Sequence, residues 1–254
     1  MEQEVALFAI CFALFLVSIL YSSVGHGGAS GYLAVLSLTS YGQLSSPWLK
    51  QHAWVLNLAV AGLAFYHYSK ANHHIFSKTL PFIVASIPFA FLGGFLKIDG
   101  AIYDTLLSIT LVYAAVRLLS NTSVEFVEAT NPQRREAYTY GAGIGFVSGI
   151  IGVGGGIFLS PILLLKRWAT PKSAAATAAM FIWVNSAAGL FGAAASNQLV
   201  IEPSTLLPFL FSVLIGGLIG SRYGALYAKQ KTVQYLLVCV LLLASGKRIF
   251  EVVM

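Results

Sequence analysis

Charged residues are scarce in this chain of 254 residues: Asp, Glu, Lys and Arg make up 9% of it, whereas 57% of the residues are hydrophobic. A soluble domain normally carries about 25% charged residues. None of these four residue types occurs between Val5 and Leu49, and a membrane-spanning helix needs only about 20 such residues. A mean hydropathy of +0.80 leaves too little polar surface for a soluble core. The composition therefore predicts an all-α, polytopic membrane protein.

Other absences narrow the function. The two cysteines, Cys11 and Cys239, both lie in apolar segments without a local partner, so we expect small buried side chains and no disulfide. The glycine-rich stretch "GVGGGIFLS" lacks the lysine of a phosphate-binding loop, which excludes ATP-driven pumping by this chain alone. The N-terminus "MEQEV" has acids where a cleaved signal peptide has basic residues. We expect no cofactor, no metal and no enzymatic activity.

The apolar segments form two groups on either side of one long polar stretch. We read this stretch, residues 121–136, as a linker between a first transmembrane repeat, residues 1–120, and a second, residues 137–254. About four spans are expected in each. The apolar segments are Val5–Val24, Ala29–Ser40, Trp48–Tyr68, Thr79–Leu96 and Ala101–Leu119, then Ala137–Ile151, Ile157–Leu165, Ser173–Ala195, Thr205–Gly220 and Val233–Ile249.

The two groups also resemble each other in sequence. A shift of 127 residues places "SSVGHGGASGYLAVL" on "GIIGVGGGIFLSPIL", and "PFAFLGGFL" resembles "FSVLIGGLI" in the same order. Near the ends, "LLSITLVYAAVR" matches the pattern of "LLVCVLLLASGK". Correspondences in one order indicate an internal duplication into two homologous halves.

Each half begins with a glycine-rich stretch inside an apolar segment. Glycines at matching positions in duplicated membrane proteins are typical of transporters, whose broken helices form the substrate site. The alternative is that the glycines only allow close helix packing. Gly152, Gly154, Gly155 and Gly156 crowd one turn and cover all its faces, whereas a packing stripe recurs at every fourth residue. We therefore expect broken or re-entrant half-helices whose glycines line a cavity.

Half-helices that begin at such breaks would favour an anion. Their first N–H groups and the positive end of the helix dipole point at a ligand, and glycine lets it approach the backbone closely. Polar side chains of the next helices fit the same site, although hydrogen bonding between helices is an equal alternative for them. The predicted substrate-binding residues are Gly25, His26, Gly27, Gly28, Gln51, His52, Asn57, Gly152, Gly154, Gly155, Gly156, Thr177 and Asn185.

His26 is the only titratable side chain within either break, so it is expected to contact the anion, to sense pH, or to form part of the cavity wall. Lys50 is read as an anchor at the membrane edge. Acidic residues stand only at segment ends, as Asp99, Asp104 and Glu202 do. Without a buried carboxylate for proton coupling, the membrane potential, worth about 2.3 kcal/mol per charge per 100 mV, would drive an anion outward.

The motifs "GHGGASG" and "GVGGGIFLSPILL", each followed by a proline and a small-residue helix ("SPWLKQHA", "ATPKSAAATAAM"), resemble the TauE/SafE family of sulfite and organosulfonate exporters. The resemblance covers essentially the whole chain. It implies export of small sulfur-containing anions, such as sulfite, thiosulfate or organosulfonates, by a multi-pass protein of the bacterial inner membrane. The residues to which it carries over are the seven glycines above and Thr177. His26 and the pair Thr177-Ala178 depart from the family pattern.

Three other functions stay open at this point. An importer of the same anions, coupled to H⁺ or Na⁺, would use protonation of His26. A membrane assembly subunit would not need paired breaks. An intramembrane protease would use Ser30 of "GASG" as nucleophile with a histidine base. The expected partners are a small anionic substrate and membrane lipid, with a homodimer as a further expectation and no nucleic acid.

Overall fold

The computed structural model describes residues 2–98, 105, 130–229, 231–232 and 235, and the described part is helical without a strand. This confirms the predicted all-α membrane class. The predicted apolar segments Ala101–Leu119 and Val233–Ile249 lie almost entirely outside the described residues, as does Cys239.

The helices follow the predicted apolar segments closely. The N-terminal part contains α1 (Glu2–Ser22), α2 (Ala29–Ser37), the short 3₁₀ helix η1 (Ser40–Gln43), α3 (Ser46–Lys70) and α4 (Phe76–Phe95). The C-terminal part contains α6 (Arg134–Ile151), α7 (Gly156–Leu165), α8 (Pro171–Ala195), α9 (Pro203–Arg222) and the π-helical turn η2 (Tyr223–Tyr227). The helix α6 begins within the stretch that was predicted to be linker.

Four described segments are long and apolar enough to cross a membrane: Glu4–Ser22, Phe76–Phe95, Pro171–Ala195 and Pro203–Tyr227. Large apolar side chains stand on the outer surface, for example Phe8, Phe191 and Phe211, each about 70% exposed or more. In water such a surface would be costly, whereas lipid solvates it. Cys11 of α1 is free, as expected, and its side chain is partly buried.

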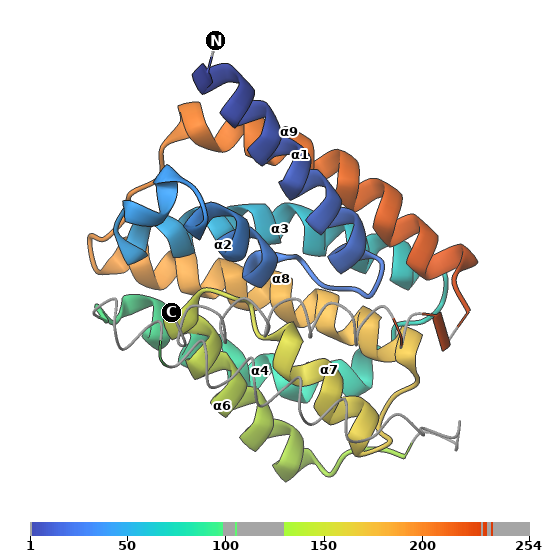
Figure 1. The fold of residues 1–254 in the computed structure, drawn as a ribbon. Coiled ribbons are helices and arrows are strands. Elements are labelled where there is room, and N and C mark those ends of the chain that lie inside the picture. The colour runs from blue at the N-terminus through green and yellow to red at the C-terminus, as the bar shows by residue number, and fades with distance from the viewer. Residues whose placement is uncertain (1, 99–104, 106–129, 230, 233–234, 236–254) are drawn as a thin grey trace.

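The helices α3 and α8 run antiparallel through the middle of the molecule, with α1 and α9 on one side and α4 and α6 on the other (Figure 1). Trp54 of α3 packs on Gly189 of α8, and Trp183 of α8 packs beside Gly62 of α3. These reciprocal contacts fix the antiparallel register. The helix α3 carries polar side chains that set it apart from the four apolar segments, and α2, α8 and α9 enclose it.

Small residues bring the flanking helices close together. Along α6, Gly141, Gly145 and Gly149 lie against the backbone of α4, so that a methyl group on any of them would come within 2.6 Å of a carbonyl oxygen. On α9, Gly216 and Gly220 approach the backbone of α1 in the same way. Close backbone approach replaces the hydrophobic effect as the source of packing energy within lipid. Both pairs, α1 with α9 and α4 with α6, run parallel.

Candidate substrate site

The two glycine-rich stretches interrupt helices, as predicted. The helix α1 ends at Ser22 and α2 begins at Ala29, while α6 ends at Ile151 and α7 begins at Gly156. Positive φ values occur at Gly25, Gly28, Gly152, Gly154 and Gly155, and at no other glycine of the described chain. Residues with a side chain rarely adopt this left-handed conformation. These five glycines therefore permit the breaks, which are residues 23–28 (the first break) and 152–155 (the second break).

Gly27 and Gly156 have a different role, because their φ values are negative. A methyl group on Gly27 would lie 2.1 Å from the side-chain oxygen of Asn57, and one on Gly156 would lie 2.2 Å from Ile182. Here glycine allows a side chain of a neighbouring helix to approach closely and is not needed for its backbone freedom.

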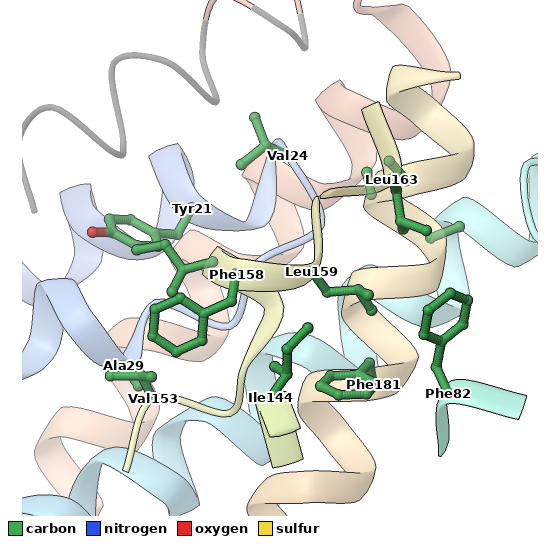
Figure 2. Packing of buried hydrophobic residues seen from close by; sticks show 14 of the residues in the cluster. Tyr21, Val24, Ala29, Phe82, Ile144, Val153, Phe158, Leu159, Leu163 and Phe181 are labelled. Carbon is green, nitrogen blue, oxygen red and sulfur yellow. The ribbon is translucent and has the colours of Figure 1, made fainter. Parts of the chain in front are cut away.

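The two breaks meet in the interior through one side chain, Asn57 of α3. The backbone N–H of Ala29 donates to Asn57 Oδ1 at 3.0 Å. The Asn57 amide nitrogen donates to the carbonyl oxygen of Val153 at 3.4 Å and to Ser186 Oγ at 3.3 Å. Asn57 is fully buried, and Ala29 and Val153 belong to the same buried cluster (Figure 2). Asn57 thus links the start of α2, the second break and α8.

The first break also packs against α8, and the second break packs against α3. A methyl group on Gly25 would lie 2.1 Å from the carbonyl oxygen of Ala175 in α8. One on Gly152 would lie 2.6 Å from Cβ of Lys50 in α3. All residues from Ser23 to Gly28 and from Gly152 to Gly155 are buried. The breaks are therefore enclosed by protein, which is the condition for irregular backbone at membrane depth.

His26 lies in the first break and is 2% exposed. Its Nδ1 donates to the carbonyl oxygen of Val24 at 3.1 Å, so Nε2 of the neutral ring carries the lone pair. Nε2 has no hydrogen-bond partner among the described residues, although the ring lies beside the backbone of Gly156. A neutral His26 therefore keeps an unpaired acceptor at Nε2, and only a protonated ring could donate a hydrogen bond to an anion from this atom.

Asn185 of α8 is the second buried amide, and its environment differs from that of Asn57. It is 1% exposed, and neither its oxygen nor its nitrogen has a hydrogen-bond partner in the described part of the chain. Ser148 of α6, which packs against Gly155 of the second break, has an unpartnered hydroxyl as well. A buried polar group without a partner costs about 1–3 kcal/mol. The unused hydroxyl of Ser148 lies beside the second break, and the unused amide of Asn185 lies one residue before Ser186, whose hydroxyl packs on Gly154 of that break.

Gln51 and His52 do not lie at the breaks. The Gln51 amide donates to the carbonyl oxygen of Gln198 at 2.5 Å and accepts from the N–H of Val200 at 2.7 Å. Nε2 of His52 accepts from the N–H of Glu202 at 3.2 Å. Both side chains thus hold the loop between α8 and α9, so their predicted role in substrate binding has no geometric support.

Thr177 pairs with another threonine. Its hydroxyl lies 3.2 Å from that of Thr79 in α4, and both residues are buried. Because Thr79 also donates to the carbonyl oxygen of Ile75, Thr177 is the donor of the pair. This arrangement corresponds to the alternative of hydrogen bonding between helices.

Ser30 donates to the hydroxyl of Tyr21 at 3.1 Å. The histidine four residues earlier bonds to backbone instead, so the described chain holds no serine–histidine pair at "GASG". No group of three or more His, Cys, Asp or Glu side chains that could hold a metal ion occurs in the residues described.

Two residues of the site were not anticipated from the sequence. Ser186 binds Asn57, and Ser148 faces the second break. The sequence signal for Ser186 was present, since it adjoins Asn185 in an otherwise apolar helix. Ser148 carried no such signal, because a serine in a span normally bonds to its own helix backbone.

Apolar helices around a buried centre, in which two broken helices meet, define the class of a membrane transporter. The sequence matches the family described as "Sulfite exporter TauE/SafE" over residues 10–248. The chain therefore belongs to the TauE/SafE family, and the resemblance seen in the sequence is confirmed.

Two curated relatives carry transporter names. The "Probable membrane transporter protein y4hK" of Sinorhizobium fredii (strain NBRC 101917 / NGR234) is 34% identical and aligned over 98% of this chain and 99% of its own length. The "Probable membrane transporter protein MJ0441" of Methanocaldococcus jannaschii is 27% identical over 53% of this chain and 51% of its own. No solved structure matches the chain significantly.

Proposed function

We propose that this protein is a secondary transporter that exports small sulfur-containing oxyanions, such as sulfite, thiosulfate or organosulfonates, across the bacterial inner membrane. The observation that carries the proposal is the meeting of both breaks at Asn57, which brings the N-termini of α2 and α7 into one buried centre. Helix N-termini supply N–H groups and a positive dipole end, and so suit an oxyanion. The family description supports the sulfur-containing class of substrate.

The two halves are proposed to form an inverted repeat around this centre. The helices that begin each half, α1 and α6, each end at a break, and each break is followed by a short and then a long helix. The long helices, α3 and α8, both have 25 residues and run antiparallel. An inverted repeat of this kind places equivalent breaks at one depth and lets the site open alternately to either side.

Asn185 is proposed as the substrate ligand of the second half. Its amide would donate to the oxyanion, and Ser148 would add a hydroxyl donor. Asn57, by contrast, already uses its side chain to hold the breaks together. We assign Asn57 to the architecture of the site and Asn185 to substrate contact.

The test is anion efflux from liposomes that contain the purified full chain and are loaded with sulfite, thiosulfate or a small sulfonate. The membrane potential is set with potassium and valinomycin. We expect saturable efflux that increases when the interior is negative. Asn185→Leu should reduce it about tenfold or more, because loss of a hydrogen bond to a charged ligand costs about 1.5–3 kcal/mol.

Asn185→Leu is informative because replacing an unpartnered buried amide with an apolar group of similar size should preserve or raise stability. Met180→Leu on the same helix is the control and should leave efflux unchanged. Unaltered efflux in Asn185→Leu would place the site elsewhere. If no sulfur anion moved under either potential, or under a pH or Na⁺ gradient, the proposed function would be wrong.

One observation favours a second candidate, an importer that couples the same anions to protons. Nε2 of His26 can meet an anion only after the ring is protonated, so binding of the anion would take up a proton. In this case, an inward proton gradient would drive uptake, and His26→Gln would abolish the dependence on that gradient. Export that follows potential alone and survives His26→Gln would exclude this candidate.

A further inference from the structure

A pocket lies at the end of the molecule where α3 begins and where α4 and α8 end. Its volume is about 470 Å³. None of its lining residues belongs to the predicted substrate site, and those that bear on its chemistry are Ser45, Ser46, Lys50, Lys97, Asn197 and Gln198. The pocket is distinct from the buried centre at Asn57.

Lys50, expected to be an anchor at the membrane edge, is instead 3% exposed and lines this pocket. No hydrogen bond or ion pair of its ammonium occurs within the described part of the chain. The contact found is with the ring of Trp54, 5.6 Å from Nζ to the ring centroid. A cation–π contact contributes about 0.5–2 kcal/mol and leaves the N–H donors of the ammonium unused. A buried cation in this state needs an anion or water to compensate it.

Two other lysines, Lys172 and Lys166, have an oxygen partner for the ammonium group. Lys172, at the start of α8, donates to the carbonyl oxygen of Ala225 at 3.1 Å. Lys166 donates to the carboxylate of Glu136 at 2.6 Å. Lys50 is at least as buried as Lys172 and has no such oxygen among the described residues, which distinguishes its environment from theirs.

The remaining lining residues add donors and positive charge. Lys97 is exposed at the pocket, and the lining found among the described residues contains no carboxylate. Ser45 and Ser46 stand at the start of α3, where Ser45 makes no side-chain capping bond. The positive end of the α3 dipole therefore adds to the two ammonium groups. This combination suits a small oxyanion and disfavours a cation.

A single residue, Lys50, lies between the pocket and the second break. A methyl group on Gly152 would lie 2.6 Å from Cβ of Lys50, so the backbone of Lys50 separates the pocket from that break. A side chain at this position can contact an anion in the pocket and attract it toward the buried centre.

We propose that this pocket is an anion-binding vestibule, in which Lys50 and Lys97 hold a small oxyanion at one mouth of the transport path. The inference rests on the proposed function for the identity of the ligand and for its route past Gly152. The same chemistry would also bind the phosphate of a lipid headgroup, and the experiment must separate these two sources.

The experiment measures sulfite flux against sulfite concentration in liposomes of phosphatidylcholine, with Lys50→Gln, Lys97→Gln and Lys50→Arg in the full chain. We expect Lys50→Gln to raise KM about tenfold with little change in kcat, because a charge-assisted hydrogen bond to the entering anion is lost. Lys97→Gln should raise KM a few-fold, and the increase should diminish at high salt. Lys50→Arg should restore most of the affinity.

Lys70→Gln is the matched control, since Lys70 ends the same helix at the opposite side of the molecule. It should leave KM unchanged. Folding is checked by the unfolding midpoint of detergent-solubilised protein with and without sulfite. Sulfite should raise the midpoint of the wild type and have a smaller effect on Lys50→Gln, as expected for a ligand that binds the native state.

The outcomes are distinguishable. Normal wild-type flux with an unchanged KM in Lys50→Gln would overturn the vestibule and leave the proposed function standing. If wild-type flux required phosphatidylglycerol, and Lys50→Gln removed that requirement without changing KM, the pocket would hold a lipid headgroup and the proposal would be wrong. If no flux occurred, but sulfite raised the unfolding midpoint of the wild type and not that of Lys50→Gln, the anion-binding pocket would be supported and the proposed transport function would be wrong.

Discussion

The side-chain oxygen of Asn57 lies 3.0 Å from the backbone nitrogen of Ala29, the first residue of α2. The nitrogen of the same amide reaches the second break, 96 residues further along the chain, at the carbonyl oxygen of Val153. One amide therefore satisfies a donor at the start of α2, directly after the first break, and an acceptor of the second break. This arrangement makes the geometry of each break depend on the other.

Asn57→Ala should destabilise the protein by about 2–4 kcal/mol. The substitution leaves buried partners at Ala29, Val153 and Ser186 unpaired and opens a cavity. The unfolding midpoint in detergent measures the loss. Thr139→Ala is the control, because the Thr139 hydroxyl bonds only to its own helix on the exposed surface, and its effect should stay within about 0.5 kcal/mol. Equal midpoints for both variants would contradict the bridging role of Asn57.

Gly25→Ala and Gly143→Ala should shift stability in opposite directions. Gly25 has φ of 77°, and a methyl group there would lie 2.1 Å from the carbonyl oxygen of Ala175, so strain and overlap should cost about 2–4 kcal/mol. Gly143 is exposed within α6 and has no atom within 4 Å of an added methyl group. Alanine there should stabilise the helix by about 0.5–1 kcal/mol. The two unfolding midpoints test this directly, and a tolerated Gly25→Ala would show that the break can rearrange.

The hydroxyls of Thr79 and Thr177 should be energetically coupled. Single substitutions by valine should each cost about 1 kcal/mol, and the double variant should cost less than their sum, since the same bond is lost only once. Unfolding of the four proteins of the cycle gives the coupling energy. Full additivity would mean that the bond contributes nothing. If Thr177→Val also abolished flux at unchanged stability, Thr177 would be a substrate ligand after all.

Stability should fall as the pH falls below about 6.5, through two histidines between α3 and α4. Burial lowers the pKa of His73, and the nearby charge of Lys172 lowers it further; burial also lowers the pKa of His74. Because the folded-state pKa lies below the unfolded value of 6.5, the unfolded chain takes up protons more readily. Stability is therefore complete above the unfolded pKa and decreases as the pH falls through it.

The unfolding midpoint measured from about pH 7.5 to pH 5.5 tests this. In His73→Gln/His74→Gln the decrease should be smaller than in the wild type. Glutamine retains a donor for the carbonyl oxygen of Ala225, which Nε2 of His73 contacts at 3.1 Å. An identical decrease in both proteins would assign the pH dependence to other groups.

Site features that depend on local backbone conformation could be predicted from the sequence, whereas those that depend on contacts between distant helices could not. Positive φ is a local property, so the glycine pattern was enough to locate both breaks. The partners of a side chain depend on which helices pack together. Gln51, His52 and Asn57 all read as polar residues in one apolar helix, yet two of them bind the loop before α9 and the third binds the breaks.

The surroundings of Lys50 could not be predicted from the sequence either. A lysine near the start of a span normally extends to the membrane surface, and the sequence offers no sign that α4 and α8 end around it. The structure buries it because α3 lies at the centre of the bundle. Asn57 and Asn185 looked alike in the sequence, and only packing distinguished them. Asn57 has three hydrogen-bond partners, whereas Asn185 has none among the residues that the structure describes.

The sequence by itself determined that this protein lies in a membrane, is helical and has two glycine breaks, because hydropathy and backbone conformation are properties of short segments. The tertiary structure alone decided that α3 and α8 run antiparallel, that the breaks meet at Asn57, and that Lys50 faces a pocket. These relationships join residues that are far apart in the chain, and only the packing of whole helices determines their distances.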